Sequence, residues 1–167
     1  LLAILFLYMA NTEVIRAQQQ VLFTDDFTEV NVGNRMNPSS LITASQLSNW
    51  TPSSTLVYAA GGALKFNSGS KFAGSITLKT PLDVSGNNGV FDVKIKAVSW
   101  TKDNTTVKVR ALSGGTELES LTHQFANGSS PYDDEKFEEY TYNFTKGNAS
   151  TVIEITGSKR FFVTEVT

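Results

Sequence analysis

From Val21 onward, apolar and polar residues alternate with a period of two along most of the chain. The segment 91–97 is the clearest case, because its odd positions hold Phe, Val, Ile and Ala, while its even positions hold Asp, Lys and Lys. Successive side chains of a strand point to opposite faces of a sheet. The pattern therefore predicts strands with one buried face and one wet face, as antiparallel sheets have.

Turn sequences rich in Gly, Asn, Ser and Asp separate these segments at short, regular intervals. Many short strands without long helical patterns between them predict an all-β sandwich or barrel. Two sheets with one wet face each would close a single core by packing face to face. One short helical turn is expected within 41–50, and a break in the chain at 51–54. The predicted strands are 21–24, 56–59, 63–67, 74–79, 89–100, 105–113, 117–125, 137–144, 151–156 and 160–166.

Composition and charge narrow the functional classes. The chain has 167 residues, 40% of them hydrophobic, which suits one domain with one core. Its formal net charge of -2 excludes the broad basic surface of a nucleic-acid binder and a polybasic patch for anionic membranes. The chain has no cysteine, which excludes disulfides, thiolate metal sites, cysteine nucleophiles and a lipidated cysteine anchor.

The first ten residues form an apolar run that is too short to span a bilayer and has the length of a signal-peptide core. Ile15-Arg16-Ala17 offers a small residue for cleavage, so we predict a signal peptide at 1–17 and one sandwich domain at 18–167. The alternative is that this apolar run is a buried strand or helix of the fold. With the signal removed, we expect a secreted or surface protein that does not insert into membranes. No initiator Met or basic stretch precedes the run, so we expect the signal to be partial.

Six segments in a fixed order resemble a known family: Phe23–Phe27, Gly74–Thr77, Pro81–Gly86, Val98–Trp100, Tyr140-Thr141 and Lys159–Val166. The order is similar to that of the jelly-roll modules of Bacteroidetes secreted and surface proteins, which look like carbohydrate-binding modules. The resemblance implies a jelly-roll sandwich that acts as a non-catalytic accessory module of a larger, multidomain chain. Its implied partner is a glycan or a surface protein. Because Thr167 falls within the strand that closes the family's domain, we expect the chain to be clipped there too.

The same resemblance implies a structural calcium ion where the first and last strands meet; no other cofactor is expected. Carried over by position, its side-chain ligands would be Asp25, Asp26 and Glu165. Thr164 stands where the family has an acidic residue, which removes one carboxylate from a cation that prefers six to eight oxygens. The alternative, which explains these residues equally well, is that Asp25 and Asp26 form a solvated acidic turn and that Glu165 is an exposed strand residue.

Trp100 is the best candidate for stacking against a sugar ring. It follows Lys94 and Lys96 on the polar face of its predicted strand, where a Trp is uncommon unless it covers a core edge or binds a ligand. Tyr58 and Tyr132 lie near loops and are weaker candidates. Packing at the edge of the sandwich is the competing explanation for Trp100, and plugging the base of the sandwich is the expected role of Trp50.

Catalytic chemistry finds little support in the residues. The one histidine, His123, shares a strand face with Leu121 and Phe125, a setting typical of a packed or hydrogen-bonded side chain. A glycosidase needs only two carboxylates. The strand carboxylates available are Glu119, Glu139 and Glu154.

We therefore expect no enzyme activity and weigh three functions. A glycan-binding module requires an open aromatic platform at Trp100. A structural spacer or adhesion module requires Trp100 to be packed at the sandwich edge. A small jelly-roll glycosidase requires two facing carboxylates in one groove.

Overall fold

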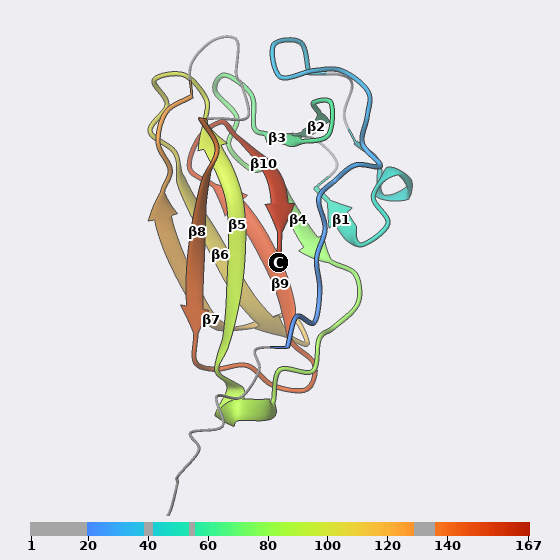
Figure 1. Ribbon diagram of the computed structural model, residues 1–167, viewed down its shortest axis with the longest axis vertical. Helices are drawn as coiled ribbons and strands as arrows, with labels where there is room; N and C mark the ends of the chain where they lie inside the picture. Colours follow the sequence, from blue (N-terminus) through green and yellow to red (C-terminus); the bar gives the residue numbers. More distant parts are fainter. Residues whose placement is uncertain (1–19, 39–41, 54–55, 129–135) are drawn as a thin grey trace, which may run out of the picture.

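The computed structural model describes residues 20–38, 42–53, 56–128 and 136–167, which fold as two five-stranded antiparallel sheets packed face to face (Figure 1). Two short segments of the described chain lie outside the sheets. η1 (Ala44–Gln46) is a single 3₁₀ turn, and η2 (Gly86–Gly89) is a kinked turn in which Asn87 and Asn88 have positive φ. In spatial order, sheet I contains β1 (Trp50–Pro52), β4 (Ser75–Leu78), β9 (Val152–Gly157), β6 (Thr106–Ser113) and β7 (Thr116–Gln124). Sheet II contains β2 (Val57–Ala59), β3 (Leu64–Phe66), β10 (Phe161–Val166), β5 (Phe91–Ser99) and β8 (Glu138–Phe144).

The chain passes repeatedly from one sheet to the other, from β4 to β5 to β6 and again from β7 through β8 and β9 to β10. This connection pattern and the purely antiparallel pairing confirm the predicted two-sheet sandwich of jelly-roll type. Among the described residues, no helix reaches the length and hydropathy that a membrane crossing needs.

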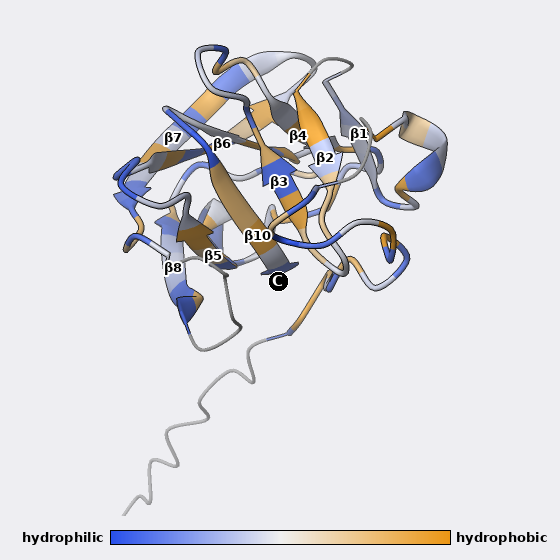
Figure 2. Ribbon diagram, turned by 90° about the horizontal axis from the view of Figure 1, so that it is seen from above, coloured by the Kyte–Doolittle hydropathy of each residue, from blue (hydrophilic) through white to orange (hydrophobic). Residues whose placement is uncertain are grey.

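The core lies between the sheets, where the alternate positions of each strand meet. Figure 2 looks along the molecule from above and shows the two layers, with hydrophobic positions along strands such as β10 and β4. Phe66 of β3 stacks on Phe161 of β10 with 4.3 Å between ring centroids, and Phe91 stacks on Phe144 at 4.9 Å. The period-two alternation thus assigned the buried faces correctly, because each strand has one face toward the other sheet.

Two predictions near the start of the domain were wrong. Residues 21–24 form no strand, and their neighbour Asp25 makes only an isolated bridge to Val166 of β10. The chain leaves the sheet at once because Phe27 takes a left-handed backbone conformation, with φ at 55°. The break expected at 51–54 begins later than predicted, because Thr51 and Pro52 still belong to β1, which pairs only with β4. Proline is tolerated there because β1 is an edge strand.

One end of the sandwich, the upper end in Figure 1, carries the β5–β6 and β9–β10 turns. The backbones of these two turns meet, since the amide of Trp100 donates to the carbonyl of Arg160 at 2.9 Å. The segment after β7 joins them, with the amide of Gly128 donating to the carbonyl of Ser99 at 2.9 Å. The fold therefore brings Trp100 into a rigid framework of three chain segments.

Candidate functional site

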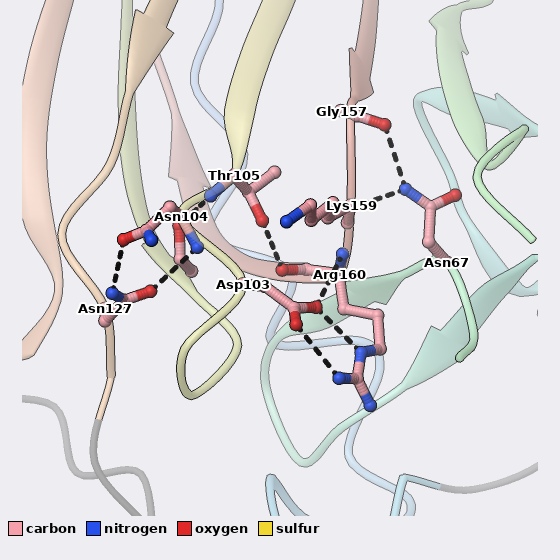
Figure 3. A network of polar contacts seen from close by, with 9 residues as sticks. Asn67, Asp103, Asn104, Thr105, Asn127, Gly157, Lys159 and Arg160 are labelled. Atoms are coloured by element: carbon pink, nitrogen blue, oxygen red, sulfur yellow. Dashed lines mark hydrogen bonds and ion pairs between the residues drawn. The ribbon is translucent and has the colours of Figure 1, made fainter. Parts of the chain in front are cut away.

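An ion pair between the two turns fixes the upper end. Arg160 donates to the carboxylate of Asp103 through Nε at 2.8 Å and through Nη2 at 3.0 Å, a two-pronged contact visible in Figure 3. The hydroxyl of Thr105 donates to the Arg160 carbonyl at 2.6 Å. Hydrogen bonds from Arg160 hold the pKa of Asp103 below its ordinary value. The guanidinium is thus held in one place on the surface.

Asparagine side chains secure the neighbouring backbone (Figure 3). The amide of Asn67 donates to the carbonyls of Gly157 and Lys159 at 3.0 and 2.7 Å, and its oxygen accepts the amide N–H of Gly74. Asn67 has φ at 69°, a conformation that asparagine adopts more readily than most residues. These bonds hold the β9–β10 turn against the end of β3, so the turn has little freedom to move.

A second, smaller apolar cluster lies on the outer face of sheet II, below these turns. Phe162 follows the core residue Phe161 directly, so its ring points to the opposite face, and it is fully buried. Trp100 stacks on Phe162 with 5.5 Å between ring centroids, and Val98 and Phe137 complete the contact. The outer face of sheet II is therefore not uniformly wet, contrary to the expectation of a single core.

Lys65 lies between two aromatic rings at the border of this cluster. It occupies the centre of β3, with Tyr58 of β2 on one side in the register and Phe162 of β10 on the other. Its Nζ is 4.5 Å from the ring centroid of Tyr58 and 5.1 Å from that of Trp100. Arg160 lies over the same Trp100 ring, at 4.9 Å. We call Tyr58, Lys65, Trp100, Asp103 and Arg160 the Lys65 patch.

The ammonium group of Lys65 carries an electrostatic penalty. The residue is only 9% exposed, and its Nζ makes no hydrogen bond or ion pair with the described part of the chain. Burial lowers the pKa of Lys65 below its ordinary value, and the nearby charge of Arg160 lowers it further, while Asp103 opposes the shift. The other four residues of the patch remain partly exposed.

The structure joins some of the predicted ligand residues and separates others. Trp100 and Tyr58 meet around Lys65, as described. Lys94 and Lys96 share the outer face of β5 with Trp100, but Lys94 lies six residues away, about 20 Å along an extended strand. Lys94 forms an ion pair with Glu139 at 3.3 Å. The predicted role of Tyr132 lies outside the described residues.

Sequence reasoning missed Lys65 and Arg160. The signal for Lys65 was present, since Leu64 and Phe66 are core residues and alternation sends the residue between them outward, beside Tyr58. The signal for Arg160 was absent, because its place over Trp100 depends on the meeting of two turns that are 57 residues apart in the chain.

The residues predicted to hold calcium do not fit that ion. The carboxylate of Asp25 is 6% exposed and accepts three N–H groups, from Trp50 Nε1 at 3.0 Å, Asn49 Nδ2 at 3.0 Å and the amide of Phe27 at 2.9 Å. Donors of this kind occupy the oxygens that a cation would need.

The other two carboxylates are used locally. Asp26 accepts the amide and hydroxyl of Thr28, at 3.1 and 2.9 Å. Glu165 lies on β10, where Thr167 donates to it at 3.5 Å. Within the described ranges, no three His, Asp or Glu side chains are grouped so as to hold a metal ion.

Each of the three strand carboxylates makes its polar contact in a different part of the sandwich. Glu139 lies on β8 in sheet II with Lys94, whereas Glu154 lies on β9 in sheet I, where Arg110 donates to it at 2.8 Å. Glu119 accepts the amide of Thr145 at 2.7 Å. The glycosidase hypothesis requires two carboxylates that face one groove, and no two of these three do so.

His123 is packed, as predicted. Its ring stacks on Tyr140 of β8 with 3.6 Å between centroids and 7° between planes. Its Nε2 lies 2.7 Å from Glu138 Oε1. The contact joins the edge strand of sheet I to the edge strand of sheet II, which is a structural role.

A groove with a volume of about 1050 Å³ lies at the end of the sandwich away from the Lys65 patch. Phe23, Val84, Phe91 and Lys94 are among the residues that line it. Phe91 is held against Phe144 on one ring face. The groove contains Lys94 alone of the predicted ligand residues, and the aromatic residues that line it are Phe23, Trp50 and Phe91.

No protein-family model and no curated protein matches the chain. Among the solved structures with similar folds are two carbohydrate-binding modules. One is CsCBM6-3 from Clostridium stercorarium in complex with cellobiose, which is 18% identical, with a TM-score of 0.50 over 77% of this chain and 92% of that chain. Another is the carbohydrate-binding module CBM1 of BiXyn10A in its apo form, 10% identical, with a TM-score of 0.50 over 89% and 96% of the two chains. At these identities the likeness establishes the β-sandwich fold.

Proposed function

We propose that this chain is a non-catalytic, exported glycan-binding module of a larger protein, and that the Lys65 patch is its binding surface. The observation that carries the proposal is the meeting of Tyr58 and Trp100 on one outer sheet face, with the N–H groups of Lys65 and Arg160 between and beside their rings. Flat aromatic surfaces with a few fixed polar groups are what a sugar ring needs, since its C–H faces are apolar and its hydroxyls are polar.

Two further observations support the proposal. The turns that hold Trp100 and Arg160 are fixed by the hydrogen bonds of Asp103, Thr105 and Asn67, so a ligand would meet a preformed surface. Folds of the same kind occur in modules whose names record carbohydrate binding, one of them in complex with cellobiose. The three strand carboxylates are dispersed, which favours binding over glycoside hydrolysis.

A structural spacer or adhesion module is the second candidate. The stacking of Trp100 on the fully buried Phe162 favours it, because this contact gives Trp100 a packing role of its own. Under that function, the patch would close the edge of the sandwich and bind no sugar.

A glycan array with the purified protein separates the two candidates. We expect at least one oligosaccharide to bind, and Trp100→Ala to weaken its binding about 10-fold or more. Trp100→Phe retains a flat ring on Phe162 and keeps the test valid if the alanine variant unfolds.

The matched control is Phe72→Ala, which removes an aromatic side chain that is 43% exposed in the β3–β4 connection, outside the patch. We expect its binding to equal that of the wild type. An array without any bound glycan, with folded protein confirmed by circular dichroism, would favour the spacer function instead.

A further inference from the structure

Lys65 occupies a buried position on the outer face of a β-sheet, where a lysine is unusual. Lysine is rarely buried without a paired carboxylate, because removing an ammonium ion from water is costly. Lys65 is 9% exposed as a residue, and its Nζ, which remains open to water, has three N–H donors and no protein acceptor among the described residues. Its neighbours in contact are two aromatic rings, which attract a cation weakly but accept no conventional hydrogen bond.

The charges around Lys65 do not cancel. Arg160 lies over the same Trp100 ring and adds a second positive charge, which lowers the pKa of Lys65 in the same direction as its burial does. Asp103 supplies one negative charge, and both of its oxygens are bound by Arg160. Counted over its five described residues alone, the patch has two cations and one carboxylate, which leaves one positive charge on Lys65.

We propose that Lys65 binds the anionic substituent of an acidic sugar, a carboxylate or a sulfate ester, while Tyr58 and Trp100 contact the sugar itself. The proposal rests on the glycan-binding function above and names its ligand class. An oxyanion in contact with Nζ would supply the acceptor that the fold leaves out and would oppose the charge of Arg160. Charge-assisted hydrogen bonds of this type are stronger than the neutral ones that a hydroxyl would form.

The geometry also restricts how the anion approaches. The Nζ of Lys65 lies 4.5 Å from the ring centroid of Tyr58 and 5.1 Å from that of Trp100, so an anion must approach Nζ from a side that these two rings do not cover. A substituent on a sugar ring meets this condition, since the ring would lie against the aromatic side chains while its substituent reaches the ammonium group. A neutral sugar would leave the Lys65 charge as it is.

The test is titration calorimetry with three oligosaccharides of similar length. One is an oligogalacturonate, which carries only carboxylates. The second is its fully methyl-esterified form, which is neutral, and the third is a carrageenan oligosaccharide, which carries only sulfate esters. We expect one of the two charged ligands to bind at least about 10-fold more tightly than the ester, and the stronger one identifies the substituent.

Variants locate the effect at Lys65. Lys65→Met removes the charge and keeps the length of the side chain, and we expect it to abolish the preference for the charged ligand. Lys65→Arg retains the charge and should restore much of the preference. Lys108→Met is the matched control, because Lys108 lies on the other sheet in an exposed ion pair with Glu117.

The outcomes distinguish the two proposals. Equal affinity for the charged ligands and the ester, or a preference that survives in Lys65→Met, overturns the acidic-sugar inference. Neutral glycans bound in a Trp100-dependent manner would still uphold the glycan-binding function. The absence of binding to all three probes and to the glycan array would overturn both.

Discussion

Asp25 and Lys65 are both buried charged residues, and their surroundings differ completely. The Asp25 carboxylate accepts three N–H groups, including the indole of the fully buried Trp50. The Lys65 ammonium group has two aromatic rings and no acceptor among the described residues. A buried charge with complete hydrogen bonding serves the fold, whereas one without a protein acceptor costs stability.

The first prediction concerns Asp25 and has the largest expected effect. Asp25→Ala leaves three donors without their acceptor, and we expect a loss of about 3 to 4 kcal/mol in the free energy of unfolding. Urea denaturation followed by tryptophan fluorescence measures this loss. Asp26→Ala is the control, because the exposed Asp26 contacts only Thr28, and we expect a far smaller loss. Equal losses for the two variants would contradict the structural role of Asp25.

The second prediction concerns the ion pair of the upper end. Asp103→Asn removes the negative charge that pairs with Arg160. We expect a loss of about 2 kcal/mol in the free energy of unfolding at neutral pH. The folded-state pKa of Asp103 lies below its ordinary value of 3.8, so its stabilisation is present above that value and is lost as the pH falls through the folded-state pKa. The variant should therefore lose less stability than the wild type on acidification below about pH 4. Parallel acid-unfolding curves would contradict this assignment.

The third prediction is that replacing the buried Lys65 does not destabilise the fold, unlike most substitutions of buried residues. The pKa of Lys65 lies below its ordinary value of 10.5, so the charged form costs stability at neutral pH. This cost begins to fall as the pH rises through the folded-state pKa and is gone above 10.5. Lys65→Met removes that cost together with two cation–π contacts. We expect a melting temperature equal to or above that of the wild type, by up to roughly 3 °C. Differential scanning calorimetry measures it, and a clear decrease would indicate that Lys65 stabilises the fold.

The fourth prediction is that calcium does not change the melting temperature. Because three N–H donors occupy the Asp25 carboxylate, we expect the melting temperature with millimolar calcium to equal that with a chelator, within about 1 °C. A rise of several degrees with calcium would revive the metal site that the family resemblance implies. Magnesium at the same concentration controls for ionic strength.

Much of the fold was predictable from local patterns. Nine of the ten strands coincide with predicted segments, because alternation depends only on which face of a strand meets the other sheet. The exceptions are informative. β1 ends in Pro52 and was missed because its tolerance of proline depends on its place at a sheet edge. Residues 21–24 have a strand-like sequence, but the turn at Phe27 and the bonds of Asp25 set their path.

The candidate site was predictable only in part. Trp100 and Tyr58 could be selected from the sequence as aromatic residues at polar-face or loop positions. Their meeting around Lys65 follows from the strand order β2-β3-β10-β5, which joins segments that are far apart in the chain. Sequence spacing carries no information on this order, since it arises from the packing of two whole sheets.

The sequence by itself determined the class of the fold, the buried face of nearly every strand and the absence of cysteine chemistry. These properties follow from periodicity and composition, which are local. The tertiary structure alone decided which charges are satisfied. It gave Asp25 its three donors and left Lys65 between two rings, because hydrogen bonds and desolvation depend on neighbours that only the folded chain brings together.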